Sequence, residues 1–137
     1  MSLILKNKYL SSCIERMNVS KYATGKIYGI RCNTTNLLYV GSTMETLKLR
    51  ESKHLTDLRG FMGELKQPRK YRTSFECLMN KNYDYFLIEE YPCKTKEELE
   101  IRETLHIHNN ICVNKNVRNI TLEDYDLSEL PSVPSFT

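Results

Sequence analysis

The stretch that decides the fold is residues 26–54, KIYGIRCNTTNLLYVGSTMETLKLRESKH. Its first half holds two runs rich in β-forming residues, 26–32 and 37–41, separated by Asn33-Thr34-Thr35-Asn36. A cluster of Asn and Thr between two such runs is typical of a hairpin loop. The stretch therefore predicts two antiparallel strands followed by the start of a helix.

The register of this hairpin decides where its tyrosines point. If the four-residue cluster is the loop, Tyr28 pairs with Gly41 and Ile30 pairs with Tyr39. Tyr28 and Tyr39 then share one face of the sheet as diagonal neighbours, about 7–8 Å apart at the backbone, and Gly41 leaves space beside the Tyr28 phenol. A one-residue slip would put the two tyrosines on opposite faces. Two tyrosines in a hairpin are also common as half-buried packing.

A helix is predicted to begin near residues 45–47, with Ser42 or Thr46 as its N-cap. Arg50 and His54 fall within the apolar stripe that helical spacing directs at the protein body. The apolar members of that stripe are Leu47, Leu58, Phe61 and Leu65. A buried guanidinium and a buried imidazole are costly unless they are paired or line a cleft. The pattern therefore indicates either a functional cleft or a structural ion pair with a satisfied core histidine.

Four further segments complete the core of the chain. Residues 66–72, KQPRKYR, form a basic loop that could contact phosphates or simply be solvated. Residues 73–79 predict a short helix with a Thr73-x-x-Glu76 cap, and its core-facing residues are Phe75, Leu78 and Met79. Residues 83–91 predict a third strand that Pro92 stops, and residues 111–113 predict a short last strand.

The last predicted helix, 95–108, carries a carboxylate on an inward face. Thr95-x-x-Glu98 has the form of a capping box, and Glu103 lies close to Leu99 on the helical wheel. An inward carboxylate is either paired with arginine or a ligand of a hard cation. Glu98 and Glu100 are expected to be ordinary exposed charges.

Composition and charge place this chain of 137 residues among single-domain proteins with a modest core. Residues 1–90 hold 15 Lys and Arg against 9 Asp and Glu, whereas residues 91–137 hold 5 against 8. This distribution fits a basic surface that faces a polyanion, although a solvated lysine-rich face would look the same.

Near the N-terminus, four apolar residues are spaced for a short helix that packs on the domain. They are Leu3, Ile4, Leu10 and Ile14.

Compartment is indicated by two features. The chain has no apolar run long enough to cross a membrane and no secretory signal, which predicts no membrane partner and no secretion. Its five cysteines are widely spaced, which favours reduced thiols over a disulfide framework or a zinc site. We therefore expect an intracellular protein, in the cytoplasm or nucleus of a host cell.

Together these segments resemble the GIY-YIG nuclease family. Lys26-Ile27-Tyr28 stands at the GIY position, with Lys for the first Gly, and Tyr39-Val40-Gly41 stands at the YIG position. Arg50 and His54 follow, and three later segments are similar to the later motifs of the family. They are LIEEYPC (87–93), ELEIRETLHI (98–107) and CVNKN (112–116). The resemblance is closest to small stand-alone members from large DNA viruses and phages, some of them homing-type endonucleases.

The resemblance implies an α+β fold that is sandwich-like, with a small, mainly antiparallel three-stranded sheet flanked by helices. It divides the chain into an N-terminal extension (1–23), a nuclease domain (24–116) and an acidic tail (117–137) that is peripheral or mobile. The implied partner is DNA, and the implied protein is a monomer or a weak dimer. Neither target specificity nor the choice between nicking and double-strand cleavage follows from it.

Carried over position by position, the resemblance implies six site residues, which are Tyr28, Tyr39, Arg50, His54, Glu103 and Asn114. The two tyrosines would lie near the scissile phosphate, one of them activating or positioning water. Arg50 would hold the phosphate oxygens, and His54 would serve as base, proton relay or orienting group. Glu103 would bind one divalent cation, Mg²⁺ or else Mn²⁺, and Asn114 would close the site.

The resemblance predicts metal-dependent hydrolysis of DNA phosphodiester bonds, a reaction that needs an in-line water, neutralised phosphoryl oxygens and help for the leaving oxygen. Basic residues around the site would bind DNA, namely Lys26, Lys53, Lys66, Arg69, Lys70 and Arg72. One alternative is a catalytically inactive nucleic-acid-binding module of the same fold. Another is a basic scaffold in which Arg50, His54 and Glu103 form a closed salt-bridge network.

Overall fold

The computed structural model describes residues 20–114 and 121–135. The apolar positions Leu3, Ile4, Leu10 and Ile14 lie outside the described residues. Along the chain, the strands are β1 (Lys26–Cys32), β2 (Leu38–Thr43) and β3 (Tyr83–Glu90), and the helices are α2 (Leu47–Phe61), α3 (Phe75–Leu78) and α4 (Lys96–His108). Two 3₁₀ turns, η2 (Lys21–Thr24) and η3 (Leu122–Asp124), flank them. None of the described helices has the length and apolarity that a membrane crossing requires.

The three strands form one antiparallel sheet in the order β2-β1-β3. Tyr28 pairs with Gly41 and Ile30 pairs with Tyr39, so the predicted hairpin register is confirmed. The predicted α+β fold, a three-stranded antiparallel sheet with flanking helices, is also confirmed. Because β1 lies in the centre, its alternating residues supply both faces of the sheet with core contacts.

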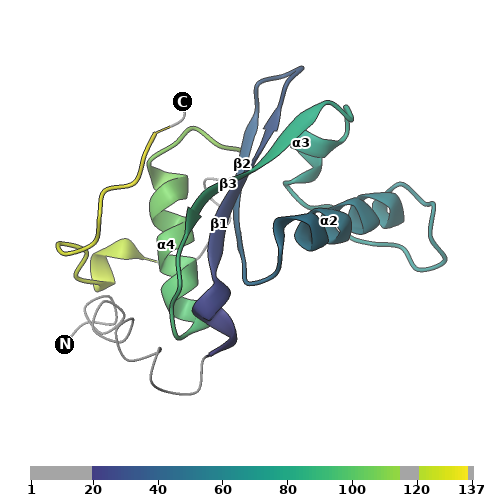
Figure 1. The fold of residues 1–137 in the computed structure, drawn as a ribbon. Coiled ribbons are helices and arrows are strands. Elements are labelled where there is room, and N and C mark those ends of the chain that lie inside the picture. Colours follow the sequence, from purple (N-terminus) through teal and green to yellow (C-terminus); the bar gives the residue numbers. More distant parts are fainter. Residues whose placement is uncertain (1–19, 115–120, 136–137) are drawn as a thin grey trace.

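Helices cover both faces of this sheet, as Figure 1 shows: α4 packs on one face, and α2 and α3 lie on the other. On the α4 side the core includes Ile27, Val40 and Leu99. On the α2 and α3 side it includes Tyr28 and Ile30, together with residues of α3. Tyr28 and Ile27 are therefore neighbours in sequence that belong to different cores, as the two-residue period of a strand requires.

Side-chain caps set the starts of the two long helices. Thr46 accepts a hydrogen bond from the backbone N–H of Leu49, so Thr46 and not Ser42 is the N-cap of α2. Thr95 accepts from the N–H of Glu98, which confirms the predicted start of α4. The predicted cap at Thr73 is wrong, because α3 begins after Ser74 without a side-chain cap.

Two predictions of exposure are wrong at α4 and α3. Glu98 was expected in solvent but is 1% exposed, because its carboxylate turns back to accept from the backbone N–H of Lys94. Met79 was expected in the core but is 42% exposed, and Cys77 is buried on α3 beside Phe75 and Leu78. In both cases a local hydrogen bond or a very short helix overrides the simple periodicity.

Two further predictions are corrected near the ends of elements. Phe61 closes α2 and is partly exposed, because its ring packs on Tyr71 and Phe75 and not under the sheet; Leu65 lies beyond the helix. Residues 111–113 do not form a strand. They lie beside β2 with one backbone hydrogen bond, from Val113 N–H to the carbonyl oxygen of Leu38.

The C-terminal residues 121–135 lie on the outer side of α4, away from the sheet (Figure 1). Their contacts include the carbonyl oxygen of Pro131, which accepts from Arg102, and that of Val133, which accepts from Asn109. The described part of the predicted tail is therefore peripheral, and it is docked on α4.

Candidate active site

The candidate site lies at the outer edge of β2, the side that does not pair with β1. Asn114 covers this edge: its Nδ2 donates to the carbonyl oxygen of Val40 at 2.5 Å, and its Oδ1 accepts from Val40 N–H at 3.3 Å. An asparagine side chain thus replaces a neighbouring strand at one residue. Both the oxygen and the nitrogen of the Asn114 side-chain amide bond to β2. Asn114 therefore supports the strand that carries Tyr39.

Tyr28 stands behind this edge, fully buried on the α2 side. Its phenol oxygen is 2.6 Å from Nε2 of His54 and accepts a 3.3 Å hydrogen bond from Nε of Arg50. The space that Gly41 was expected to leave is filled by this phenol, since a Cβ at Gly41 would lie 2.5 Å from the Tyr28 ring. Tyr85 stacks on the ring from β3, with centroids 4.9 Å apart. Gly41 is therefore needed for the phenol to reach α2.

His54 is 2% exposed and lies between Tyr28 and Ser74, whose Oγ is 3.1 Å from Nδ1. Burial lowers the pKa of His54 to about 3, and the positive charges of Arg50 and Arg72 add to the effect. The imidazole is therefore neutral at physiological pH. Burial also raises the pKa of Tyr28, despite the opposing charge of Arg50. Two neutral groups thus share this short hydrogen bond.

Glu103 reaches the same region from the other face of the sheet. It is 2% exposed on α4, and its Oε1 accepts a 2.5 Å hydrogen bond from Oγ of Ser42 on β2. Ser42 and Tyr39 are three residues apart on β2 and therefore point to opposite faces. The Glu103 carboxylate therefore approaches the α2 side chains past the outer edge of β2.

A pocket of about 420 Å³ brings these side chains together. Arg50 and His54 of α2, Tyr39 of β2 and Glu103 of α4 line it. The remaining wall consists of Asn114 and the segment Tyr71, Arg72, Thr73 and Ser74. Five of the six predicted site residues thus line one hollow, and Tyr28 lies behind it, with its ring centroid 6.3 Å from that of Tyr39.

Residues 24–111 match the family model of the GIY-YIG catalytic domain. The chain belongs to the GIY-YIG family. This is a family of nuclease-type proteins that contains DNA endonucleases, so the fold is that of a nuclease domain. Comparison with curated proteins and with solved structures found no significant match.

The predicted DNA-binding residues of this GIY-YIG chain are not all equally available. Lys66 and Lys70 are exposed. Lys26 donates to the carbonyl oxygens of Thr24 and Glu45 at the open end of the hairpin, and Lys53 forms a 2.6 Å ion pair with the Glu45 carboxylate. The remaining two, Arg69 and Arg72, share the carboxylate of Asp57. Of the six residues, Arg72 alone lines the pocket.

Sequence reasoning missed the residues that hold the predicted ones in place. Ser42, Ser74 and Tyr85 contact Glu103, His54 and Tyr28 respectively. Tyr85 could have been found, because it pairs with Ile30 across β1 and β3 and therefore shares the Tyr28 face. Ser42 was interpreted as a possible helix cap and Ser74 was given no role, and nothing in their local sequence signals contacts 61 and 20 residues away.

The donor groups of the pocket decide whether it fits a divalent cation. The described residues contain no group of three or more His, Cys, Asp or Glu side chains that could hold a metal ion alone. Mg²⁺, however, commonly uses one or two protein carboxylates and takes its other ligands from water and substrate phosphate. Glu103 is a carboxylate that lines the same pocket as Arg50, so the donor set fits a cation shared with a bound phosphate.

Proposed function

We propose that this chain is a divalent-metal-dependent DNA endonuclease that binds the scissile phosphate in the pocket at the β2 edge. The observation that carries the proposal is the convergence of Tyr39, Arg50, His54 and Glu103, from three elements, on one hollow. Phosphodiester hydrolysis requires a positioned anion-binding group, an activated water and help for the leaving oxygen. These residue types supply such groups.

Arg50 is the proposed phosphate ligand. Its guanidinium is partly buried at the pocket wall, and its Nε is committed to the Tyr28 phenol. Its terminal nitrogens are suited to bidentate contact with two phosphoryl oxygens. Because Tyr28 is neutral, the hydrogen bond orients Arg50 without cancelling its charge.

Glu103 is the proposed ligand of a divalent cation, Mg²⁺ or Mn²⁺. Such a cation, when bound, supplies positive charge to the phosphoryl oxygens and to the leaving oxygen. Ser42 orients the carboxylate by donating to one of its oxygens. A ligand held in this way needs little rearrangement when substrate arrives.

The two tyrosines have different proposed roles, which their positions support. Tyr39 lines the pocket and is half-buried, so its phenol is the one that can position the attacking water. Tyr28 is buried with a raised pKa and serves to hold Arg50 and His54. His54 packs edge-on against the Tyr39 ring, with centroids 5.7 Å apart. The proposed role of the neutral imidazole is therefore to orient Tyr39.

A plasmid assay tests this function. Purified protein mixed with supercoiled plasmid should nick or cut it with Mg²⁺, and excess EDTA should stop the reaction. Glu103→Gln should lower the rate at least about a hundred-fold while retaining DNA binding, because it removes charge at the metal ligand and little volume. Glu90→Gln, an exposed glutamate outside the pocket, is the matched control and should cut normally. Cutting that persists in EDTA would contradict the proposed mechanism.

The second candidate is a catalytically inactive DNA-binding module of the same fold. It would bind DNA with Glu103 or with Gln at that position and would cut with neither. A buried carboxylate beside a phosphate site weakens anion binding, which argues against a module that only binds. The scaffold alternative requires an ion pair from Arg50 or His54 to Glu103, and the ion pairs found among the described residues include none.

We also propose that the enzyme acts alone and inside a cell, as a monomer or a weak dimer. Cys32, Cys77 and Cys93 are buried thiols, a composition typical of reducing compartments. The resemblance to small stand-alone members from DNA viruses and phages supports an enzyme that acts without a partner protein.

A further inference from the structure

We propose that Tyr71 stacks on an unpaired DNA base beside the scissile phosphate, so that the enzyme prefers DNA whose duplex is interrupted near the cleavage site. This inference rests on the proposed function and adds a substrate class to it. It is carried by one exposed aromatic ring at the pocket and by the way the protein holds that ring.

Tyr71 lies on the wall of the pocket that contains Arg50, His54 and Glu103. It is 49% exposed, whereas Tyr28 in the same region is fully buried. Its neighbours in the chain are Lys70 and Arg72, both basic and exposed. An exposed aromatic ring between two cations is the composition by which proteins bind single-stranded nucleic acid, with the ring on the base and the cations on the backbone.

An aromatic support holds the Tyr71 ring. It packs on Phe61 with centroids 5.6 Å apart and on Phe75 at 5.8 Å, both in edge-to-face geometry. Phe75 is itself fully buried on α3. This support explains why Phe61 ends α2 away from the sheet. A ring held in this way loses little conformational freedom when a base stacks on it.

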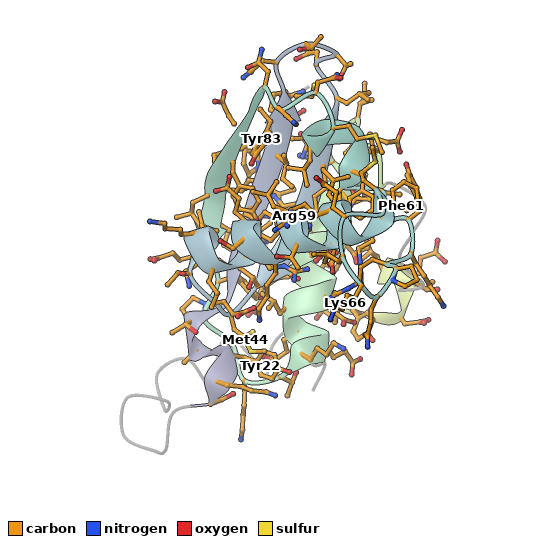
Figure 2. The ribbon with its side chains drawn as sticks, turned by 90° about the vertical axis from the view of Figure 1, so that its right-hand side faces the viewer. Tyr22, Met44, Arg59, Phe61, Lys66 and Tyr83 are labelled. Carbon is orange, nitrogen blue, oxygen red and sulfur yellow. The ribbon has the colours of Figure 1, made fainter. Side chains whose placement is uncertain are left out.

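The loop that carries Tyr71 is itself attached to α2. Asp57 accepts from Nη1 of Arg69 at 2.7 Å and lies 3.3 Å from Nε of Arg72. The Arg69 stem lies directly on Gly60, where a Cβ would come within 2.1 Å of Cγ. In Figure 2, the labelled Phe61 and Lys66 both lie to the right of Tyr22 and Met44. The loop therefore presents Tyr71 at a set place.

The stacking proposal determines the substrate class. In an uninterrupted duplex the two faces of each base are covered by its neighbours, so a fixed ring can stack only where a base is unpaired or unstacked. A bulge, gap or branch next to the scissile phosphate provides such a base. Arg72, on the same pocket wall, would contact the adjoining phosphate.

Binding of fluorescent oligonucleotides tests the proposal. One probe is a duplex with a single bulged 2-aminopurine, and the second is the same duplex without the bulge. Both are titrated with full-length Glu103→Gln protein, which prevents cutting. The protein should quench the bulged 2-aminopurine and bind that probe more tightly. Adding Tyr71→Ala should abolish quenching and weaken binding of the bulged probe about 5- to 150-fold, the value of one stacked base, with little change for the plain duplex.

Three control variants separate stacking from other effects. Tyr71→Phe keeps the ring and should behave as Tyr71, whereas Tyr71→Leu keeps apolar packing on Phe61 and Phe75 and should behave as Tyr71→Ala. Tyr125→Ala removes a tyrosine that bonds Glu97 on the far side of α4 and should change neither probe. Thermal unfolding of each variant verifies the fold.

Equal losses on the two probes, or quenching that survives Tyr71→Ala, would overturn the proposal. Loss of quenching in Tyr71→Phe would do so too, because it would assign the effect to the hydroxyl. These readouts are independent of catalysis: a wild-type protein that never cuts plasmid refutes the endonuclease, while quenching still decides the role of Tyr71.

Discussion

Within the described residues, a histidine, an arginine and an oxygen partner form a cluster on each side of the sheet, and the two clusters have different roles. The first, called here the pocket cluster, is Tyr28, Arg50 and His54. The second, called here the α4 cluster, is Glu89, Arg102 and His106. In the α4 cluster the shared partner is a carboxylate, whereas in the pocket cluster it is a phenol.

The α4 cluster is closed. Arg102, 1% exposed, donates twice to the carboxylate of Glu89, and Nε2 of His106 lies 2.8 Å from Oε1 of the same group. Burial by itself would raise the pKa of Glu89, but the hydrogen bonds from His106 and Arg102 outweigh it and lower that pKa to about 2. The charges are matched inside the protein, and the cluster stabilises the docking of α4 on β3.

The pocket cluster leaves the positive charge of Arg50 unmatched by its phenol partner. A neutral partner keeps Arg50 oriented and leaves its charge for an anion that enters the pocket. The comparison shows that a buried histidine with an arginine indicates function only when the groups they bond to are known. Four predictions test this contrast, and they are ordered from the largest expected effect to the smallest.

Glu89→Gln should have the largest effect on stability. It leaves Arg102 buried without its counter-charge, and breaking a buried pair from one side costs about 3–5 kcal/mol. Urea unfolding measures the loss. DNA cleavage by the variant, measured where it is still folded, should stay near wild type, because Glu89 lies outside the pocket. A stability change below 1 kcal/mol, on the order of a surface pair, would refute a closed cluster.

Arg50→Ala should have the opposite pattern, a large loss of cleavage rate with little loss of stability. Removing a preorganised charge at a reacting phosphate lowers rates about a hundred- to a thousand-fold. Unfolding free energy should change by no more than about 1 kcal/mol, because the Tyr28 phenol keeps His54 as a partner. Cleavage kinetics with urea unfolding of the same samples gives both numbers. Wild-type turnover in this variant would remove Arg50 from the site.

The two clusters should lose stability in different pH ranges. The His54 pKa is lowered from 6.5 to about 3, so the unfolded chain takes up a proton below pH 6.5 that the folded chain does not bind. Stability therefore falls as pH drops from 6.5 towards 3, by about 1 kcal/mol per unit. The Glu89 carboxyl, lowered from 4.5 to about 2, contributes stability above pH 4.5 that is lost between pH 4.5 and 2.

His54, and not Glu89, should therefore contribute to the fall in stability between pH 6.5 and 4.5. His54→Gln should flatten the fall of unfolding free energy in that range and leave the fall below pH 4.5 in place. Unfolding curves at half-unit pH steps give the slopes. Parallel slopes for wild type and variant above pH 4.5 would show that His54 is not held neutral by burial.

The exposed lysines of the basic loop should have the smallest effect. Lys66→Ala with Lys70→Ala should weaken DNA binding and reduce the slope of log K against log salt by about 1 for each phosphate that the protein no longer binds. The cutting rate of bound DNA should not change, since neither lysine lines the pocket. Lys94→Ala, an exposed lysine before α4, is the control. A changed cutting rate would mean that the loop positions the scissile phosphate.

Local periodicity explains which parts of the fold and of the candidate site could be predicted from the sequence. Alternation and the Asn and Thr loop predicted the register that places Tyr28 opposite Gly41, and helical spacing predicted that His54 and Glu103 face inward. The same reasoning was wrong at Glu98, because a carboxylate that caps its own helix is buried for a local reason that periodicity does not contain.

By itself, the sequence determined the three strands of the sheet, the hairpin register and the inward direction of His54 and Glu103, because these depend on neighbours within a few positions. Only the tertiary structure decided which tyrosine lines the pocket, that Glu103 bonds to Ser42 and also lines the pocket at the β2 edge, and that Glu89 neutralises the buried Arg102. Those facts depend on how α2 and α4 pack on opposite faces of the sheet. A side chain's direction is local, but its partner is set by packing across the fold.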